Sequence, residues 1–136
     1  MNKDLRLSSA IHILIALDYM GGFLSSRQLA LSLQSNPGFI RRIISQLSRA
    51  GLIETEKRKG KGSRLAREPR TITIAEIYLA IGCHRLFKSF EKEPFKKCRV
   101  SCCIKSSLDR VYEDIEGAML ARMKKITLKD IITKMK

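Results

Sequence analysis

A break at Asn36-Pro37 constrains the fold of this chain more than any other sequence feature, because it separates two short helical patterns. Proline has no backbone N–H and disfavours helical geometry in the residue before it, so the first helix must end there. Proline is also favoured in the first turn of a helix, which places the start of the second helix at Pro37. Gly51 stands where this second helix needs a C-terminal cap. The inward faces follow helical spacing and consist of Leu29, Ala30 and Leu33, then Ile40, Ile43, Ile44 and Leu47.

Directly after these helices the sequence predicts a basic hairpin. Residues 52–56 alternate in part like a strand, Gly60 and Gly62 supply a turn, and Arg64 begins the returning strand. The basic residues of this hairpin are Lys57, Arg58, Lys59, Lys61 and Arg64. A charge run is usually only a solvated face. Two helices joined by a tight turn and followed by a cationic hairpin are, however, typical of a DNA major-groove reader with a wing on the flanking phosphates or minor groove.

The charge of the chain supports a polyanionic partner. Among 136 residues, 27 lysines and arginines stand against 13 acidic residues, which gives a formal net charge of +14 and a pI near 10.1. Such a balance favours nucleic acid over an anionic membrane as the partner. A hydrophobic content of 44% is ordinary for a folded protein, and the length suits one compact domain with a real core.

The sequence also predicts a cytoplasmic protein with no membrane partner. No apolar run approaches the roughly 18 residues that a membrane span needs. The apolar stretch at residues 11–17 contains His12 and lacks a convincing signal-peptide cleavage site after it. Four cysteines without an export signal indicate reduced thiols rather than a disulfide framework.

Helices are also predicted on both sides of the helix-turn-helix. Ser8 or Ser9 can cap a first helix, and we expect His12, which falls among its apolar positions, to be a partly buried structural residue. Thr73 can cap a helix after the hairpin, and Thr127 can cap a short last helix.

A long amphipathic helix is predicted from residue 104 onward. Its apolar residues recur at spacings of about four and three, so they form one seam on a helix of roughly five or six turns. The seam consists of Ile104, Leu108, Val111, Ile115 and Met119. It can pack on its own domain or pair with a second copy. We favour dimerisation, because a helix-turn-helix reader usually needs two half-sites and a long narrow seam suits a partner helix.

Two segments resemble a known protein family. NPGFIRRIISQLSRAGLI at residues 36–53 and ITIAEIYLAI at residues 72–81 are similar to the Rrf-two (Rrf2) family of bacterial winged-helix transcription factors. The resemblance extends over nearly the whole chain, to ITLKDIITKM at residues 126–135. It implies a homodimer on a palindromic operator, with one recognition helix in each major groove and one wing beside it. Such operators often lie near genes for redox, nitrosative or metal stress.

The resemblance implies that residues at the start of the second helix contact DNA. Arg42 points farthest from the core by helical spacing, whereas the residue that matches Arg41 in related proteins tends to read bases, so both remain candidates. Arginine can make a bidentate contact to guanine that lysine makes less well. The wing departs from the family's run of three glycines and is more charged. The predicted DNA-binding set is Ser26, Asn36, Pro37, Gly38, Phe39, Arg41, Arg42, Ser45, Lys57, Arg58, Lys59, Lys61 and Arg64.

The cysteines mark a second departure from the family. Cluster-binding members place three cysteines in the loop before the long helix, with several residues between each. This chain has Cys98, Cys102 and Cys103 there, with gaps of three residues and none. Adjacent cysteines seldom serve as two independent ligands of one small cluster. The spacing therefore disfavours an iron–sulfur cluster, and we predict neither a cofactor nor a metal site.

Thiol sensing by these three cysteines is the hypothesis that the sequence favours over a cluster. Lys96, Lys97 and Arg99 surround Cys98, and nearby cations and a helix N-terminus both stabilise the reactive thiolate. Oxidation to a sulfenic acid or a disulfide can then shift the long helix that sets half-site spacing. In the simpler alternative some cysteines are small buried hydrophobes, which Cys83 fits best, and the effector is something else.

The expected fold is mainly α with a small β-hairpin wing. We expect a winged helix-turn-helix at residues 1–82, a cysteine-containing loop at 83–103, and a dimerisation helix with a short C-terminal helix at 104–136. The expected function is dimeric, sequence-specific transcriptional regulation, as a repressor that responds to redox or nitrosative stress. The alternative is a basic RNA- or ribosome-associated protein without a sensing role, although the chain lacks aromatic stacking platforms. No enzyme is expected, because no Ser/His/acid set or phosphate-cradling loop is visible.

Overall fold

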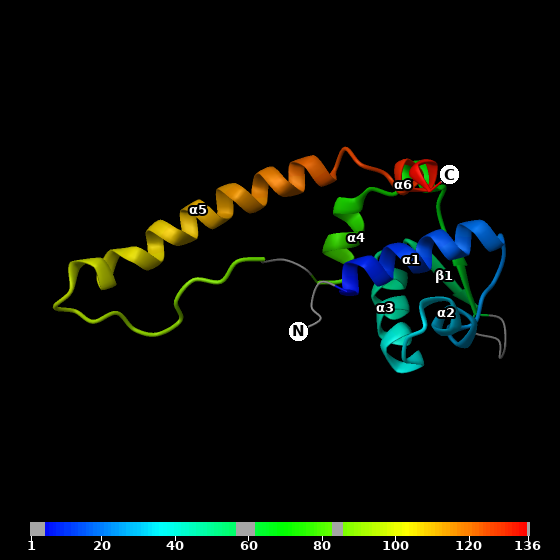
Figure 1. The fold of residues 1–136 in the computed structure, drawn as a ribbon, viewed down its shortest axis with the longest axis horizontal. Helices are drawn as coiled ribbons and strands as arrows, with labels where there is room; N and C mark the ends of the chain where they lie inside the picture. Colours follow the sequence, from blue (N-terminus) through cyan, green and yellow to red (C-terminus); the bar gives the residue numbers. More distant parts are fainter. Residues whose placement is uncertain (1–4, 57–61, 83–85, 136) are drawn as a thin grey trace.

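A computed structural model describes residues 5–56, 62–82 and 86–135 (Figure 1). A two-stranded antiparallel hairpin stands among mostly helical elements, so the predicted fold class, mainly α with a hairpin wing, is confirmed. The helices are α1 (Leu5–Met20), α2 (Ser26–Leu33), α3 (Pro37–Arg49), α4 (Ile74–Ala80), α5 (Arg99–Met123) and α6 (Leu128–Lys134). The hairpin strands are β1 (Ile53–Glu56) and β2 (Gly62–Leu65), and the 3-10 helix η1 (Pro69–Thr71) follows them.

Local sequence signals explain the boundaries of α2 and α3. Ser25 and Gln28 form a reciprocal capping box at the start of α2, and Gln34 ends it in the left-handed conformation. The Asn36 side chain caps α3 by accepting hydrogen bonds from the backbone N–H groups of Gly38, at 2.6 Å, and Phe39, at 3.4 Å. The predicted break is therefore confirmed.

The start of α1 was predicted wrongly. The helix already includes Leu5, so Ser8 and Ser9 lie within it rather than ahead of it. Leu5, Arg6 and Leu7 are good helix formers, and Leu7 packs against the core, so tertiary contact extends the helix beyond the serine cap signal. A helix can thus begin before a possible capping residue when the residues ahead of that cap make apolar contacts with the core.

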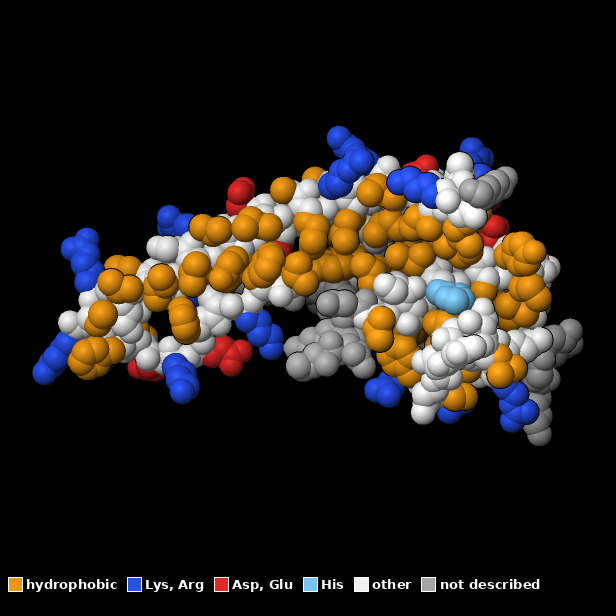
Figure 2. All heavy atoms as spheres, viewed as in Figure 1, with side chains coloured by type: hydrophobic (Ala, Val, Ile, Leu, Met, Phe, Trp, Pro, Cys, Tyr) orange, Lys and Arg blue, Asp and Glu red, His pale blue; other side chains and the backbone are white. Residues whose placement is uncertain are grey.

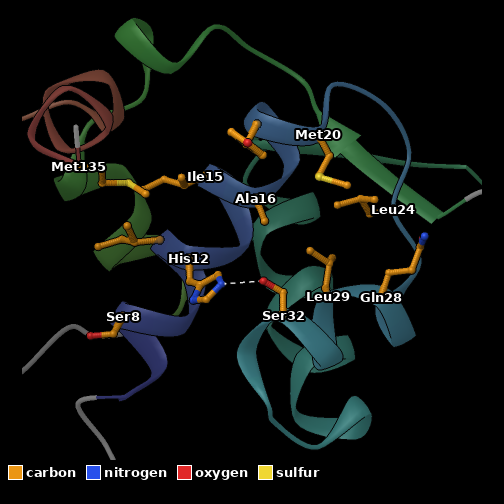
Figure 3. A pocket seen from close by; sticks show the side chains of 12 residues that line it. Ser8, His12, Ile15, Ala16, Met20, Leu24, Gln28, Leu29, Ser32 and Met135 are labelled. Carbon is orange, nitrogen blue, oxygen red and sulfur yellow. Dashed lines mark hydrogen bonds between the residues drawn. The ribbon is translucent and has the colours of Figure 1, made fainter.

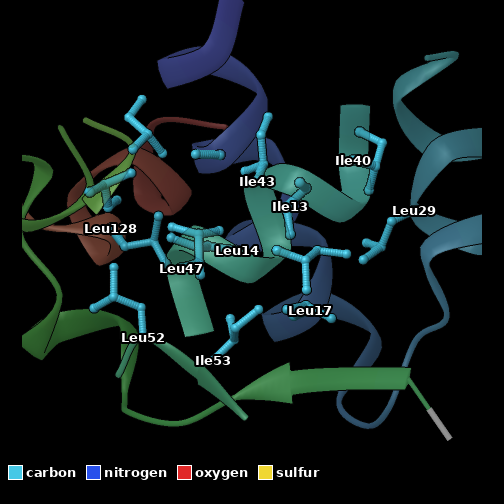
Figure 4. Packing of buried hydrophobic residues seen from close by; sticks show 14 of the residues in the cluster. Ile13, Leu14, Leu17, Leu29, Ile40, Ile43, Leu47, Leu52, Ile53 and Leu128 are labelled. Atoms are coloured by element: carbon cyan, nitrogen blue, oxygen red, sulfur yellow. The ribbon is translucent and has the colours of Figure 1, made fainter. Parts of the chain in front are cut away.

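The hydrophobic core lies where α1 crosses α3, next to the hairpin (Figure 4). The inward residues that the spacing predicted for α3 are all buried, with Ile40 and Leu47 fully so. Ile13 and Leu14 of α1 belong to the same core and also have no exposed surface. Fully burying such a side chain is worth about 1.5–3 kcal/mol, so this layer holds the second helix of the helix-turn-helix firmly on the domain.

The hairpin is attached to the rest of the domain through the connection between α1 and α2. Leu24 and Ser63 exchange two backbone hydrogen bonds of 2.8 Å each, which extend the ladder of β2 by one more bridge. Gly62 lies under this bridge with a φ of +83°, and a Cβ there would approach the Leu24 carbonyl oxygen to 2.1 Å. Only glycine fits both the conformation and the space. The hairpin bases Lys57, Arg58, Lys59 and Lys61 lie outside the described residues.

The last helix belongs to the same domain as the helix-turn-helix. Leu128, the first residue of α6, is fully buried in the core, and its backbone N–H donates to the Ile72 carbonyl at 2.8 Å. Ile74 donates in turn to the Ile126 carbonyl at 2.9 Å. The predicted unit at residues 104–136 therefore needs correction, because α6 returns to the first domain while α5 does not.

An ion pair joins the exit of the hairpin to α4. The Arg67 guanidinium donates to both carboxylate oxygens of Glu76, at 2.6 and 3.1 Å, and also to the Thr71 carbonyl oxygen. Glu76 completes a capping box with Thr73, which confirms the predicted cap. The hydrogen bond from Arg67 lowers the pKa of Glu76 below its ordinary value, with a smaller contribution from Thr73.

This lowered pKa predicts a pH dependence of stability. A carboxylate whose pKa is lower in the folded state stabilises the fold fully above its unfolded pKa, and that stability disappears as the pH falls through the folded pKa. We expect the urea midpoint to fall on acidification below the ordinary glutamate pKa, and to fall less in Glu76→Gln. Because the Glu76 side chain is 38% exposed, the difference should be modest. An identical acid dependence in both proteins would contradict this role of the pair.

Helix α5 leaves the compact domain (Figure 1). It begins at Arg99 rather than at the predicted Ile104, so Cys102 and Cys103 lie in its first turns instead of in the preceding loop. The chain at residues 86–98, the strap, runs back along the helix. Glu116 of α5 accepts backbone hydrogen bonds from Leu86 and Phe87 of the strap. These contacts hold the strap against α5.

Candidate nucleic-acid interface

Helix α3 presents a polar, basic face opposite its buried one. Arg41, Arg42 and Ser45 are exposed, whereas Ile40 and Ile44 are buried. Because successive helical residues are about 100° apart, helical spacing puts Arg42 on the side away from the core and Arg41 on its flank. Two guanidinium groups on one exposed helix face can contact base edges and phosphates in a groove about as wide as a helix. The α3 face is therefore the main part of the candidate interface.

The turn before α3 is built by its cap. The exposed residues Asn36 and Pro37 precede the helix, and a Cβ added to Gly38 would meet the Asn36 side-chain oxygen at 3.0 Å. Phe39, which was predicted to bind DNA, is half-buried and packs against the core, so part of its side chain is not available to DNA. Ser26, the first residue of α2, is half-buried beside its cap. The Gly38 and Phe39 N–H groups already donate to Asn36, so the turn offers small polar side chains more than backbone donors or aromatic surface.

Arg64 is the one predicted wing base that the described residues include. Its Nε donates to the Glu54 carboxylate at 2.9 Å, directly across the hairpin, and its guanidinium carbon lies 4.9 Å from the centre of the Phe23 ring. Its side chain is still 52% exposed. Glu54 and Phe23 were not predicted. The Glu54 contact follows from strand register, but Phe23 comes from the α1–α2 connection, which no local pattern places there.

The cysteines occupy distinct positions at the start of α5. Cys98 is its N-cap residue, is half-buried, and its sulfur accepts a hydrogen bond from the Ser101 backbone N–H at 3.5 Å. The thiol of Cys102, which is exposed, lies 3.6 Å from the backbone carbonyl oxygens of both Phe95 and Lys96. Cys103 is exposed as well. Cys83 lies outside the described residues.

These three cysteines do not converge on one point. Cys98 and Cys102 line the same cavity, and Cys103, the next residue on the helix, does not line it. Across residues 5–56, 62–82 and 86–135, no three His, Cys, Asp or Glu side chains are placed to hold a metal ion. This arrangement does not fit an iron–sulfur cluster held by the three cysteines of one chain.

The predicted seam on α5 is largely uncovered. Ile104, Val111 and Ile115 are 36, 51 and 45% exposed, Leu108 and Met119 are half-buried, and none of the 25 residues of α5 is buried. Figure 2 shows hydrophobic side chains in a band that runs along α5 and continues over the compact domain. Within this chain, the seam therefore lacks the cover that a packed helix would have.

An apolar groove lies between α1 and α2 (Figure 3). It has a volume of about 670 Å³, and its polar edge is the 2.9 Å hydrogen bond between His12 Nε2 and the Ser32 hydroxyl. His12 is exposed, so the prediction of a partly buried histidine was wrong. Its neighbours on α1 do reach the core, but the ring itself turns outward to α2.

Among the described helices, none combines the length and apolarity needed to cross a membrane.

Comparisons with known proteins agree with one another. Residues 3–134 match the family model of Rrf2, described as an iron-dependent transcriptional regulator. YwnA of Bacillus subtilis strain 168, which bears the name of an HTH-type transcriptional regulator, is 33% identical over 127 residues that cover 93% of this chain and 94% of YwnA. A crystal structure described as a DNA-binding protein is 32% identical, covers 93% of this chain and 98% of its own, and has a TM-score of 0.75. T. potens IscR shares the fold at 21% identity, with a TM-score of 0.68 over 96% of this chain and 85% of its own.

Proposed function

The chain belongs to the Rrf2 family of transcriptional regulators, and we propose that it represses transcription as a homodimer on a palindromic operator. The predicted family and the predicted absence of enzymatic activity are confirmed by this membership. DNA is therefore its partner, and the alternative of an RNA- or ribosome-associated protein has no support.

The observation that carries the proposal is the exposed arginine face of α3. Arg41 and Arg42 are exposed on a helix whose opposite face is locked into the core, and the hairpin with Arg64 is attached to the same domain. In this arrangement α3 enters the major groove and the hairpin lies on the flanking backbone. A dimer bound in this way over a promoter blocks access to it, which is the basis for proposing a repressor. Such a regulator acts in the cytoplasm, where the chromosome is.

A second copy of the chain is the proposed cover for the α5 seam. A helix of 25 residues is about 37 Å long, and two recognition helices that read successive major grooves must lie about 34 Å apart. An α5–α5 pairing supplies both the cover and the spacing. The same interface would also cover the apolar groove beside α1, since an uncovered apolar surface of this extent is costly in water.

The proposed signal is oxidative or nitrosative modification of the cysteines at the start of α5. Cys102 and Cys103 are exposed and Cys98 lines a cavity, so each is reachable from solvent. Modification there alters the N-terminal turn of the helix that is proposed to set half-site spacing. No iron–sulfur cluster is part of the proposal.

Operator binding tests the proposal directly. Fluorescence anisotropy on DNA from upstream of the gene, against scrambled DNA of equal length, should show preference for the first. Arg41→Ala or Arg42→Ala should weaken this binding about tenfold or more, because one good bidentate base contact contributes about 1–3 kcal/mol. Arg122→Ala on α5 removes the same charge away from the interface and is the matched control. Undiminished binding by both α3 variants would contradict the recognition-helix assignment.

The same assay tests the signal. Oxidation of the wild-type protein should reduce operator binding, and a thiol reductant should restore it. Protein in which Cys98, Cys102 and Cys103 are all serine should bind the operator and ignore the oxidant. Loss of binding in that oxidised triple variant would show that the signal acts elsewhere.

A further inference from the structure

A cavity of about 530 Å³ lies between the strap and the first turns of α5. This volume is within the range of small-molecule sites, about 300–1,000 Å³. Its walls are mainly apolar, and two of the three cysteines of α5 line it while the third does not. The apolar lining consists of Phe90, Pro94, Val100 and Ile104. A thiol at the wall of an apolar cavity meets whatever the cavity binds, which a thiol on open surface does not.

The two thiols that line the cavity differ in their hydrogen bonds. Cys98 Sγ accepts from the Ser101 backbone N–H, at the N-terminus of a 25-residue helix. Cys102 Sγ instead faces two carbonyl oxygens, those of Phe95 and Lys96, at 3.6 Å each. A donor N–H stabilises negative charge on sulfur, whereas carbonyl oxygens repel it. Cys98 is therefore placed as the nucleophile, and Cys102 is held as a hydrogen-bond donor.

We propose that this cavity binds small apolar α,β-unsaturated carbonyl compounds and presents them to Cys98. The regulatory meaning of this modification rests on the proposed function, but the binding and the reaction do not. An apolar electrophile gains free energy by transfer from water to the walls. Lys92, Glu93 and Lys105 also line the cavity, and Lys105 Nζ donates to the Asp109 carboxylate at 2.8 Å. The strap is needed for this site, because Phe90 and Pro94 form the wall that faces α5.

The reaction needs no oxidant. The Cys98 thiolate sulfur forms a bond to the β-carbon of the substrate, the carbon–carbon π bond breaks, and its electron pair moves through the α-carbon to the carbonyl oxygen. The resulting enolate takes up one proton from water at the α-carbon, which balances the proton lost by the thiol. The product is a neutral thioether of Cys98 with a saturated carbonyl.

The adduct lies beside the proposed dimer seam. Ile104, the first residue of the seam, is also part of the cavity wall. A group held covalently between the strap and α5 occupies space next to that residue. Modification of Cys98 therefore changes the surroundings of Ile104, at the N-terminal end of the α5 seam.

Two enones that differ by a phenyl group test the site. Full-length reduced protein is treated with benzalacetone or with methyl vinyl ketone, and the adduct rates at each cysteine are followed by peptide mass spectrometry. The ratio of rates at Cys98 and Cys103 cancels the intrinsic reactivity of each reagent. We expect this ratio to be about tenfold higher for benzalacetone, because partial burial of a phenyl ring contributes about 1.4 kcal/mol. An equal ratio for the two reagents would overturn the proposal.

Variants of the cavity wall show whether Cys98 reacts because the cavity binds the enone or only because its thiol is accessible. Phe90→Ser and Val100→Ser change exposed side chains of the wall, so the fold should tolerate them. Each should lower benzalacetone addition at Cys98 and leave addition at Cys103 unchanged. Equal addition at Cys98 in the variants and the wild type would also overturn the proposal. Because no DNA is present, these results stand apart from any failure of operator binding.

Discussion

Replacing Val111 and Ile115 together by aspartate is expected to convert the protein to monomers and to lower operator affinity about a hundredfold or more. Both side chains lie on the exposed seam of α5, where a second copy is proposed to cover them. Two carboxylates in an apolar helix pair would lose their hydration without a partner. A monomer also loses the gain of engaging two half-sites at once, which is about 10²–10⁴ in affinity. Sedimentation equilibrium and anisotropy measure the two effects.

A pair of aspartates on the other side of α5 is the matched control. By helical spacing Arg110 and Gly117 lie opposite the seam, both are exposed, and a Cβ at Gly117 would meet open space. Arg110→Asp with Gly117→Asp lowers the charge of the same helix by even more than the seam variant does, because it also removes a cation, and should still leave the dimer intact. Dimers that persist in the seam variant would instead mean that another surface holds the two copies together.

Gly62→Ala is expected to destabilise the domain by about 2 kcal/mol or more, through a conformation and a contact that only glycine accepts. The alanine Cβ would lie 2.1 Å from the Leu24 carbonyl oxygen and 2.8 Å from the Ser25 backbone nitrogen. Neither atom can move without breaking the two Leu24–Ser63 hydrogen bonds that attach the hairpin. Urea unfolding measures the loss of stability.

Gly21→Ala separates the two causes. Gly21 has a φ of +60°, but a Cβ there would meet nothing within 4 Å. We expect this variant to lose only the conformational part, about 1 kcal/mol. Equal losses at Gly21 and Gly62 would mean that the close approach to Leu24 contributes nothing, and that the hairpin is held by other contacts.

Local signals in the sequence were sufficient to predict the helix-turn-helix. The end of α2, the Asn36 cap and Pro37 start of α3, and the buried face of α3 depend on residues within a few positions of one another. The Thr73 and Thr127 caps were predictable for the same reason. Each of these features rests on backbone geometry or on helical spacing, which neighbouring residues decide.

The start of α5 shows where this kind of reasoning fails. The apolar seam begins at Ile104, so its periodicity gave no sign of the five preceding helical residues. Two contacts stabilise these residues as a helix. The Cys98 sulfur caps it by accepting from the Ser101 backbone N–H, and the Phe95 backbone N–H of the strap donates to the Ser101 hydroxyl at 2.8 Å. The prediction therefore placed Cys102 and Cys103 in the loop, and it missed the cavity that Cys102 shares with Cys98.

The sequence by itself determined the family, the break between α2 and α3, and which face of α3 is buried, because caps, proline geometry and helical periodicity act over a few residues. Tertiary structure alone decided that Leu128 closes the core, that Phe23 lies under Arg64, and that Leu24 anchors the hairpin. Each of those contacts joins elements far apart along the chain. Which distant residues meet depends on how the helices pack as a whole, and no short segment carries that information.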